Sequence, residues 1–243
     1  MLLARLSLEQ GPRYGVYDNS RYAILADDPM FGKLDLTGQF VDSDDARILT
    51  PMIPRSKIVG FDGVYSTDSV DKLDVYIKPN TAVIGGDEAI TMPQAVDKLV
   101  CHAQLAAIIS RPCRDLTPLA APSVVFGYTL ALDFSAPTLG AVRGRVFDTS
   151  CVLGPHIDTE ADPSHMLIKT TCGDTVAEYD TGDMRVGVAE IIAHASQLFT
   201  LLPGDIVLLG APESARIDVH APAVLQSDAG NIGHLVAPVV ALN

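Results

Sequence analysis

The sequence predicts a mainly β protein of the α+β class, with few helices and a curled mixed sheet that carries a site among its loops. Short apolar runs rich in Val, Ile, Leu and Tyr recur along the chain, and Gly, Pro and Asp separate them, as is typical of strands and turns. One stretch, within residues 181–205, has the apolar spacing of an amphipathic helix.

The first 50 residues contain the alternating runs RLSLEQ, RYGVYD and RYAILAD, which predict a small antiparallel sheet. The two prolines in RILTPMIPRSK then break regular structure, and a new strand begins at KIVGF. We therefore predict a small N-terminal β domain over residues 1–52 and a larger domain over residues 53–243.

The larger domain continues with runs that read as strands, namely LDVYIKPNTAVIGGDEAITMP, LAAIIS, SVVFGYTLALDFS, MLIKTTCGDTVAEYDT and DIVLLGAP. TPLAAPSVVF predicts a shorter helix that leads into a strand. The main helix places one apolar face at i, i+3, i+4 and i+7 spacing, formed by Val188, Ile191, Ile192, Ala195, Leu198 and Phe199.

The charge of the chain narrows the classes of partner. With a formal net charge of −13 over 243 residues, the surface repels phosphate backbones and anionic membranes, so we expect no nucleic-acid or membrane partner. No apolar run reaches the roughly 18 residues of a spanning helix, and the first residues lack a signal-peptide core, so we expect a cytoplasmic protein. The cysteines form no C-x-x-C pair and read as buried free thiols: Cys101, Cys113, Cys151 and Cys172.

The stretch LVCHAQLAAII poses the main question about chemistry. In a strand, residues two apart face the same side, so His102 and Gln104 point together while Ala103 faces away. The pair could be part of a metal site, the remains of one, or two polar side chains on a half-buried face. No phosphate-binding loop or nucleophile elbow accompanies it, since GGDEAI lacks a Lys-Ser/Thr and GAPES lacks a G-x-S-x-G pattern.

Six motifs, in order along the chain, resemble the fumarylacetoacetate hydrolase family: IPRSKIVG, IKPNTAVIGGDEAI, FGYTLALDFS, RVFDTSCVLGP, TLLPGDIVLLGAP and GNIGHLVAPVV. The resemblance covers roughly residues 50–243, and the N-terminal sheet also fits some bacterial members. That family includes acylpyruvate hydrolases, oxaloacetate decarboxylases and an isomerase/decarboxylase of aromatic catabolism. The resemblance implies a rolled mixed β-sheet fold and a dimer or larger assembly.

The resemblance also implies a hard divalent cation, Mg²⁺ or Mn²⁺, which chelates the 2-oxo and carboxylate oxygens of the substrate and stabilises an enolate. The family supplies an E-x-E pair and an Asp as ligands. Here the E-x-E pair falls on His102 and Gln104, and the Asp is retained as Asp133. The loss of two carboxylates disfavours Mg²⁺, so Mn²⁺ or Zn²⁺ fits this set better, and a site without metal is the alternative.

The lid His of the family is replaced by Ser66, and the Thr of its G-T-P turn is replaced by Ala211. Because the metal ligands and the lid His are substituted, the sequence leaves open whether the chain is an enzyme.

The resemblance assigns substrate binding to Arg145, which stands where the family has Lys, and to the retained Asp148 and Thr149. It also makes Arg145 and Lys78 candidate catalytic residues. The other interpretations are a surface lysine for Lys78 and a salt bridge with Asp148 for Arg145.

Three functional hypotheses follow from the resemblance. The first is a hydrolase, isomerase or decarboxylase of a small anionic 2-oxo or enol dicarboxylate, with an altered metal site. The second is a non-catalytic paralogue that binds an anionic metabolite or serves as a dimer partner, either with its own copy or in a heteromer with a complete paralogue. The third is a repurposed isomerase or lyase that works without metal.

Overall fold

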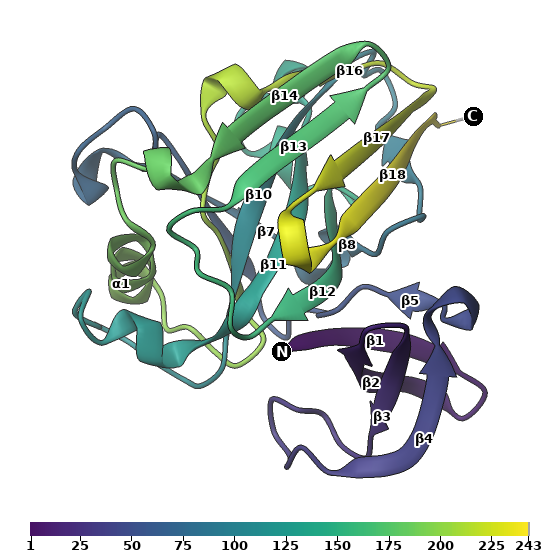
Figure 1. Ribbon diagram of the computed structural model, residues 1–243. Coiled ribbons are helices and arrows are strands. Elements are labelled where there is room, and N and C mark those ends of the chain that lie inside the picture. The colour runs from purple at the N-terminus through teal and green to yellow at the C-terminus, as the bar shows by residue number, and fades with distance from the viewer. Residues whose placement is uncertain (243) are drawn as a thin grey trace.

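The computed structural model describes residues 1–242, which form two β-sheets and, within that range, a single α-helix (Figure 1). The larger sheet contains thirteen strands and the smaller one five. Most strand pairs are antiparallel, but three are parallel, so the architecture is mixed. The predicted fold class, mainly β with few helices, is therefore confirmed.

The main path of the larger sheet runs through ten strands in this order: β4 (Leu36–Asp42), β3 (Arg21–Leu25), β2 (Gly11–Asp18), β1 (Leu2–Leu8), β12 (Cys151–Asp158), β11 (Val125–Ser135), β10 (Leu99–Ile109), β15 (Ile206–Leu208), β6 (Ile58–Asp62) and β7 (Asp74–Lys78). Three short strands pair with it from the side: β5 (Ile48–Leu49) with β1, β8 (Val83–Ile84) with β12, and β16 (Ile217–Val219) with β10. The smaller sheet has the order β14 (Thr175–Asp180), β13 (Leu167–Cys172), β17 (Ala223–Asp228), β18 (His234–Ala241) and β9 (Ile90–Met92).

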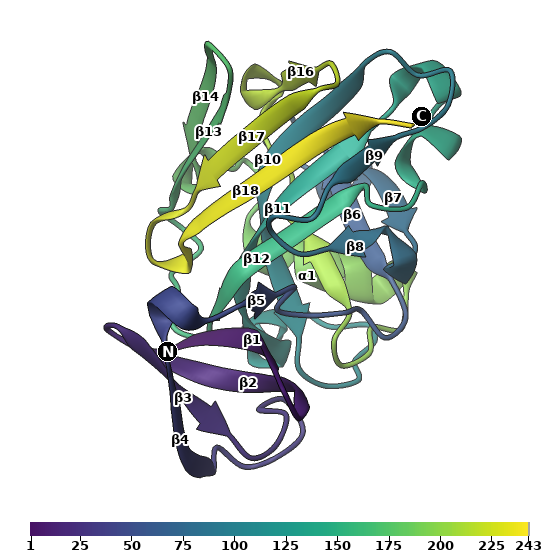
Figure 2. The ribbon, with the colours of Figure 1, turned by 90° about the vertical axis from the view of Figure 1, so that its right-hand side faces the viewer.

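The N-terminal strands β1–β4 form an antiparallel meander that stands apart from the rest of the molecule in Figures 1 and 2. A small apolar cluster of its own holds it together, made of Ala4, Leu6, Tyr22 and Ile24. It joins the larger body where β1 pairs with β12, and Tyr22 Oη lies 2.8 Å from His156 Nε2 across that junction. The predicted small sheet is present, and the division at residue 52 stays a prediction.

The side chains of strand β10 alternate between two apolar clusters on opposite faces of the larger sheet. Its odd-numbered residues, such as Cys101 and Leu105, belong to the main apolar cluster, together with side chains of β18 and of α1 (Val188–Leu198). Its even-numbered residues Ala106 and Ile108 belong to a second cluster on the opposite face. In Figure 2 the smaller sheet lies across β10–β12 while α1 lies behind them.

Helix α1 confirms the predicted helix but is shorter than its apolar pattern. Its first turn is fixed by Glu190, whose carboxylate accepts a hydrogen bond of 2.9 Å from the Gly187 N–H. Ile191 and Ile192 are fully buried, whereas Leu198 is 44% exposed and Phe199 lies beyond the last turn. The shorter predicted helix is a 3₁₀ turn at Ala121–Val124 that leads into β11.

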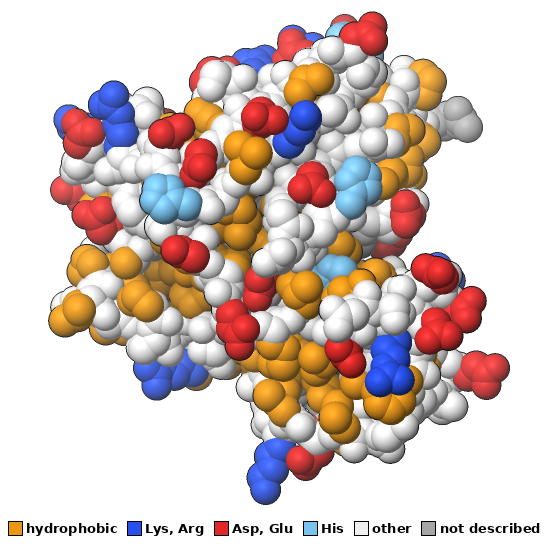
Figure 3. All heavy atoms as spheres, viewed as in Figure 1, with side chains coloured by type: hydrophobic (Ala, Val, Ile, Leu, Met, Phe, Trp, Pro, Cys, Tyr) orange, Lys and Arg blue, Asp and Glu red, His pale blue; other side chains and the backbone are white. Residues whose placement is uncertain are grey.

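The surface agrees with the acidic composition. Figure 3 shows Asp and Glu side chains spread over the visible face, and hydrophobic side chains gathered over the N-terminal strands. All four cysteines are free, as predicted, but only Cys101 and Cys151 are buried, whereas Cys113 and Cys172 are partly exposed. Within residues 1–242, no helix combines the length and the apolar character needed to cross a membrane.

Candidate functional site

The three residues that the resemblance assigns to the metal site lie together on one face of the larger sheet. Strands β10 and β11 pair so that His102 stands directly opposite Asp133, and Gln104 is the diagonal neighbour. The Gln104 Nε2 atom lies 3.3 Å from Asp133 Oδ2. Ala103 faces the opposite side, into the main apolar cluster, as predicted.

Lys78 approaches this carboxylate from β7 and is not a surface residue, because its side chain is 0% exposed. Its ammonium lies 2.9 Å from Asp133 Oδ1, as an ion pair without the geometry of a directed hydrogen bond. It also donates to the backbone carbonyls of Phe134 and Arg145 and to the hydroxyl of Ser150, at 2.8–3.0 Å. With its donors committed to these oxygens, Lys78 holds Asp133 in place and is shielded from any ligand.

Tyr76 lies two residues before Lys78 on the same face of β7, and its hydroxyl donates a hydrogen bond of 2.7 Å to Asp133 Oδ2. Its ring crosses β6 at Gly60, its direct partner in the sheet, where a Cβ atom would overlap the ring. Burial raises the pKa of Tyr76 well above its usual value, so the hydroxyl stays protonated and acts as a donor.

Arg145 contributes the second cation, from the 3₁₀ turn Arg143–Arg145. Its Nη1 lies 3.4 Å from Asp133 Oδ2, and its Nη2 donates to Asp62 Oδ2. The guanidinium stacks on the ring of Tyr76, with Cζ 3.9 Å from the ring centre. The alternative interpretation of Arg145, a salt bridge with Asp148, is therefore wrong in its partner, because Arg145 pairs with Asp62 and Asp133.

The orientation of the Gln104 amide follows from a backbone contact. The N–H of Gly210 donates to Gln104 Oε1 at 2.6 Å, so the oxygen of the amide points toward Gly210 and the NH₂ group points toward Asp133. Gly210 has a φ of +79°, and a Cβ there would lie 2.8 Å from the Phe61 carbonyl oxygen, so the turn requires glycine. Gln104 thus presents a donor, not an acceptor, to the centre of the site.

These residues do not fit a hard divalent cation. Both oxygens of Asp133 already have side-chain partners, and the Gln104 oxygen is taken by the backbone. The formal charges of Lys78 and Arg145 cancel those of Asp133 and Asp62, so these four groups together carry no net negative charge that would attract a dication. Among residues 1–242, no three His, Cys, Asp or Glu side chains are grouped as metal ligands.

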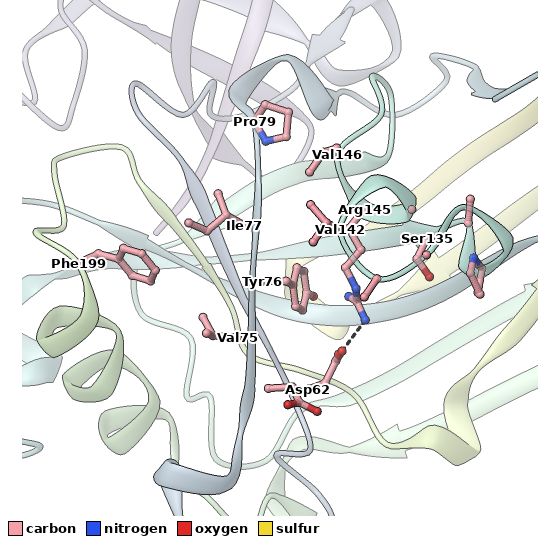
Figure 4. A pocket seen from close by; sticks show the side chains of 16 residues that line it. Asp62, Val75, Tyr76, Ile77, Pro79, Ser135, Val142, Arg145, Val146 and Phe199 are labelled. Carbon is pink, nitrogen blue, oxygen red and sulfur yellow. Dashed lines mark hydrogen bonds and ion pairs between the residues drawn. The ribbon is translucent and has the colours of Figure 1, made fainter.

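Two cavities meet at Arg145 and Asp62. The first, of about 230 Å³, is called here the His102 cavity and is lined by Asp62, Gly63, Tyr65, Ser66, His102, Arg145, Ala211, Pro212 and Glu213. The second, of about 980 Å³, is called the apolar cavity; Figure 4 shows its side chains, mainly from β7 and the segment 135–146. The positions where the resemblance placed the lid His and the Thr of the turn, Ser66 and Ala211, thus border the same cavity as His102 and Arg145.

Burial shifts the pKa values of His102 and Asp62, which both line the His102 cavity. Burial lowers the pKa of His102 from its ordinary value of 6.5, so its imidazole is neutral at neutral pH. Its Nε2 lies 3.8 Å from the Glu213 carboxylate. Burial also raises the pKa of Asp62, against the opposing effect of the Arg145 charge. A neutral imidazole and a fixed guanidinium therefore face the same small space.

Two predicted substrate-binding residues lie elsewhere. Neither Asp148 nor Thr149 is among the described residues that line the two cavities. The hydroxyl of Thr149 accepts a hydrogen bond of 2.9 Å from the Thr91 N–H, so it is engaged in holding β9. Asp62 and Tyr76 had no predicted role, although Asp62 ends the strand KIVGFD and Tyr76 shares the strand face of Lys78.

Comparison with known families gives two matches along the chain. Residues 63–240 match the family described as fumarylacetoacetate (FAA) hydrolase C-terminal, and residues 1–51 match the family described as Rv2993c-like, N-terminal. Among curated proteins, oxaloacetate tautomerase fahd2, mitochondrial, from Xenopus laevis is 28% identical over 183 residues. That match covers 68% of this chain and 57% of the tautomerase.

Solved structures of similar proteins share the whole fold. The 5-carboxymethyl-2-hydroxymuconate delta-isomerase from Mycobacterium smegmatis has a TM-score of 0.91 and 30% identity, with 100% of both chains covered. The maleylpyruvate hydrolase from Sphingobium sp. SYK-6, solved in complex with manganese(II) ion and pyruvate, has a TM-score of 0.83 and 26% identity, also over 100% of both chains. The rolled mixed β fold predicted from the six motifs is confirmed.

Proposed function

Because the chain belongs to the fumarylacetoacetate hydrolase family, we propose that it interconverts the enol and keto forms of small 2-oxo acids without a divalent cation. An isomerase and a tautomerase are among its relatives. This reaction moves one proton between carbon and oxygen and breaks no carbon–carbon bond. It therefore requires only a positive charge beside the enolate oxygen and one acid–base group.

The observation that carries the proposal is the pairing of Arg145 with a neutral His102 on one cavity. The guanidinium is held by Asp133 and stacked on Tyr76, so its position is fixed before a ligand arrives. A planar guanidinium matches the two oxygens of a 2-oxo carboxylate in a bidentate contact. We propose that this contact takes the role that the family assigns to the metal.

Asp62 occupies the outer side of Arg145 and acts as a placeholder for the ligand. Its side chain is 45% exposed, whereas Asp133 on the other side is 2% exposed, so an incoming carboxylate would displace Asp62 and leave Asp133 in place. The raised pKa of Asp62 makes its charged form less favourable in this position, which lowers the cost of that exchange.

In the proposed reaction, His102 removes the proton from the carbon next to the 2-oxo group. The electron pair of that C–H bond forms the C=C bond of the enolate, and the negative charge on its oxygen lies beside Arg145. The protonated imidazole then delivers the proton to the oxygen, which completes the enol. The reverse order converts enol to keto, and no other reactant is consumed.

Hydrolysis or decarboxylation is less well supported by these residues. Both break a carbon–carbon bond, and hydrolysis also needs a base that activates water. The position of the lid His is Ser66, an exposed residue whose hydroxyl donates to the Gly63 carbonyl at 3.1 Å. The site therefore offers a single imidazole, which suits a proton shuttle.

The test follows the loss of enol absorbance with protein freed of metal by EDTA. The substrates are the enol forms of oxaloacetate and of phenylpyruvate, a 2-oxo acid with an uncharged side chain. We expect catalysis without added metal and a loss of about 10²-fold or more in kcat/KM for Arg145→Gln or His102→Gln. Arg143→Gln is the matched control, because Arg143 is exposed on the same 3₁₀ turn and lines neither cavity.

The pH profile gives a second readout. Since only the neutral imidazole accepts a proton and its pKa lies below 6.5, kcat/KM should fall as the pH drops through an apparent pKa below that value. His102→Gln should abolish this decrease of kcat/KM at low pH. A rate that requires added Mn²⁺ or Mg²⁺, or an unchanged rate in Arg145→Gln, would refute the proposal.

The hypothesis of a non-catalytic paralogue makes a different prediction with the same samples. It predicts ligand binding without turnover, and a heteromer with a complete paralogue in place of a homodimer. Light scattering of the purified chain, alone and mixed with such a paralogue, measures the assembly directly.

A further inference from the structure

Arg145 and Asp62 line both cavities, so the His102 cavity and the apolar cavity are neighbours across one ion pair. In Figure 4 the Arg145 side chain points toward Asp62, with Tyr76 beside it. A ligand whose carboxylate takes the place of Asp62 on Arg145 would therefore have its remaining atoms directed toward the larger space.

The larger space is apolar and exposed. It is bordered by β7 through Val75 and Ile77, by the segment after β11 through Val142 and Val146, and by Phe199 after α1 (Figure 4). The four aliphatic side chains are 39–76% exposed. Their exposure costs free energy that an uncharged ligand chain would recover by covering them.

The charges around the two cavities favour a ligand with one carboxylate. Among the described lining residues, Arg145 is the one cation, since Lys78 is buried behind Asp133. The acidic lining residues are Asp62, Asp74 and Glu213. A second carboxylate in the apolar cavity would find no positive partner and would be repelled by Asp74.

We propose that the substrate is a 2-oxo acid with a single carboxylate and an extended uncharged tail. The acid head binds Arg145 at the His102 cavity, and the tail lies in the apolar cavity against Val142 and Ile77. This inference rests on the proposed function, and it narrows the ligand from 2-oxo acids in general to those with a single carboxylate.

The experiment measures binding by calorimetry, so that it does not depend on turnover. The ligands are 2-oxobutanoate, 2-oxohexanoate and 2-oxooctanoate, with the dicarboxylate 2-oxoadipate as the partner of equal length for 2-oxohexanoate. We expect the dissociation constant to fall by about fourfold for each methylene buried. We expect 2-oxoadipate to bind about tenfold more weakly than 2-oxohexanoate, because its second carboxylate has no partner.

A charge-insertion variant tests where the tail lies. Val142 is 76% exposed, so Val142→Arg should leave the fold intact and add a cation to the apolar cavity. It should reverse the preference, so that 2-oxoadipate binds more tightly than 2-oxohexanoate. The matched control is Val176→Arg, at a valine on β14 that is 59% exposed and lines neither cavity; it should leave the preference unchanged.

The outcomes separate the two proposals. If no 2-oxo acid binds, the proposed function fails and this inference fails with it. If 2-oxo acids bind but 2-oxoadipate binds as tightly as 2-oxohexanoate, or tail length has no effect, the function stands and the inference alone is refuted. Tail-dependent binding that Val142→Arg leaves unaltered would also refute it, since the tail would then lie elsewhere; a second copy of the chain that covers the cavity would give this result.

Discussion

Replacing Asp133 by Asn tests the ion pair on which the site is built. The substitution keeps the shape of the side chain and removes its charge, so the ammonium of Lys78 is left buried without its counter-ion. It also replaces one carboxylate oxygen by an NH₂ donor, which would face another donor in either orientation: Lys78 at the position of Oδ1, or Tyr76 and Gln104 at that of Oδ2. Both effects destabilise the folded state.

The magnitude follows from the distance and the burial of the two groups. At 2.9 Å and an effective dielectric constant of about 20, two unit charges attract by about 6 kcal/mol. Part of this offsets the cost of desolvation, so the expected loss in the free energy of unfolding is about 3–5 kcal/mol for Asp133→Asn. Lys78→Met should cost about the same, and the double variant should cost about 2–3 kcal/mol less than the sum.

The assay is urea denaturation followed by circular dichroism, with the slope of each transition checked for constancy. The matched control is Lys98 with Asp218, an ion pair of similar length, 2.7 Å, whose side chains are 35% and 45% exposed. Solvent screens that pair, so Lys98→Met and Asp218→Asn should each cost less than about 1 kcal/mol. If Asp133→Asn lowers the free energy of unfolding by less than about 1 kcal/mol, or if its effect adds to that of Lys78→Met without coupling, the buried ion pair does not hold the site together.

Three further changes give independent tests. Because the site is formally neutral, a double variant with His102→Glu and Gln104→Glu should gain Mn²⁺ binding in calorimetry, while the unchanged chain should show none. Gly60→Ala should displace the ring of Tyr76 and lower the free energy of unfolding by about 2–4 kcal/mol in urea. Burial lowers the pKa of His156 from 6.5, so the unfolded state binds its proton first as the pH falls. Stability should therefore decline below about pH 6.5, and His156→Gln should reduce this decline; an equal decline in both would contradict the assignment.

Local sequence pattern and the family resemblance predicted which residues of β10 and β11 come together in the site. The alternation along LVCHAQLAAII placed His102 and Gln104 on one face, and pairing with β11 brought Asp133 to them. Period-two side-chain direction is a property of the strand itself, so the sequence is sufficient to predict it. The small N-terminal sheet and helix α1 were also predicted from local periodicity, which is two residues in a strand and 3.6 in a helix.

The partners of the charged residues could not be predicted in this way, because they depend on strands that are distant in the sequence. Lys78 looks like an exposed lysine before a proline, yet the fold brings its side chain from β7 to Asp133 on β11 and buries it there. Arg145 and Asp62 are 83 positions apart and meet through tertiary structure alone. Asp148 is close to Arg145 in the sequence, but the tertiary structure gives Arg145 the partners Asp62 and Asp133.

The hydrogen bond from Gly210 to Gln104 has a consequence for how such a site changes over time. A peptide N–H persists through every substitution except that by proline, so position 104 meets a donor on that side. Glutamate and glutamine both bring an oxygen that accepts this hydrogen bond. They differ in the other atom of the group, which is a charged oxygen in glutamate and an NH₂ donor in glutamine. A single exchange between glutamine and glutamate can therefore change the charge of the pocket while the backbone around it keeps its conformation.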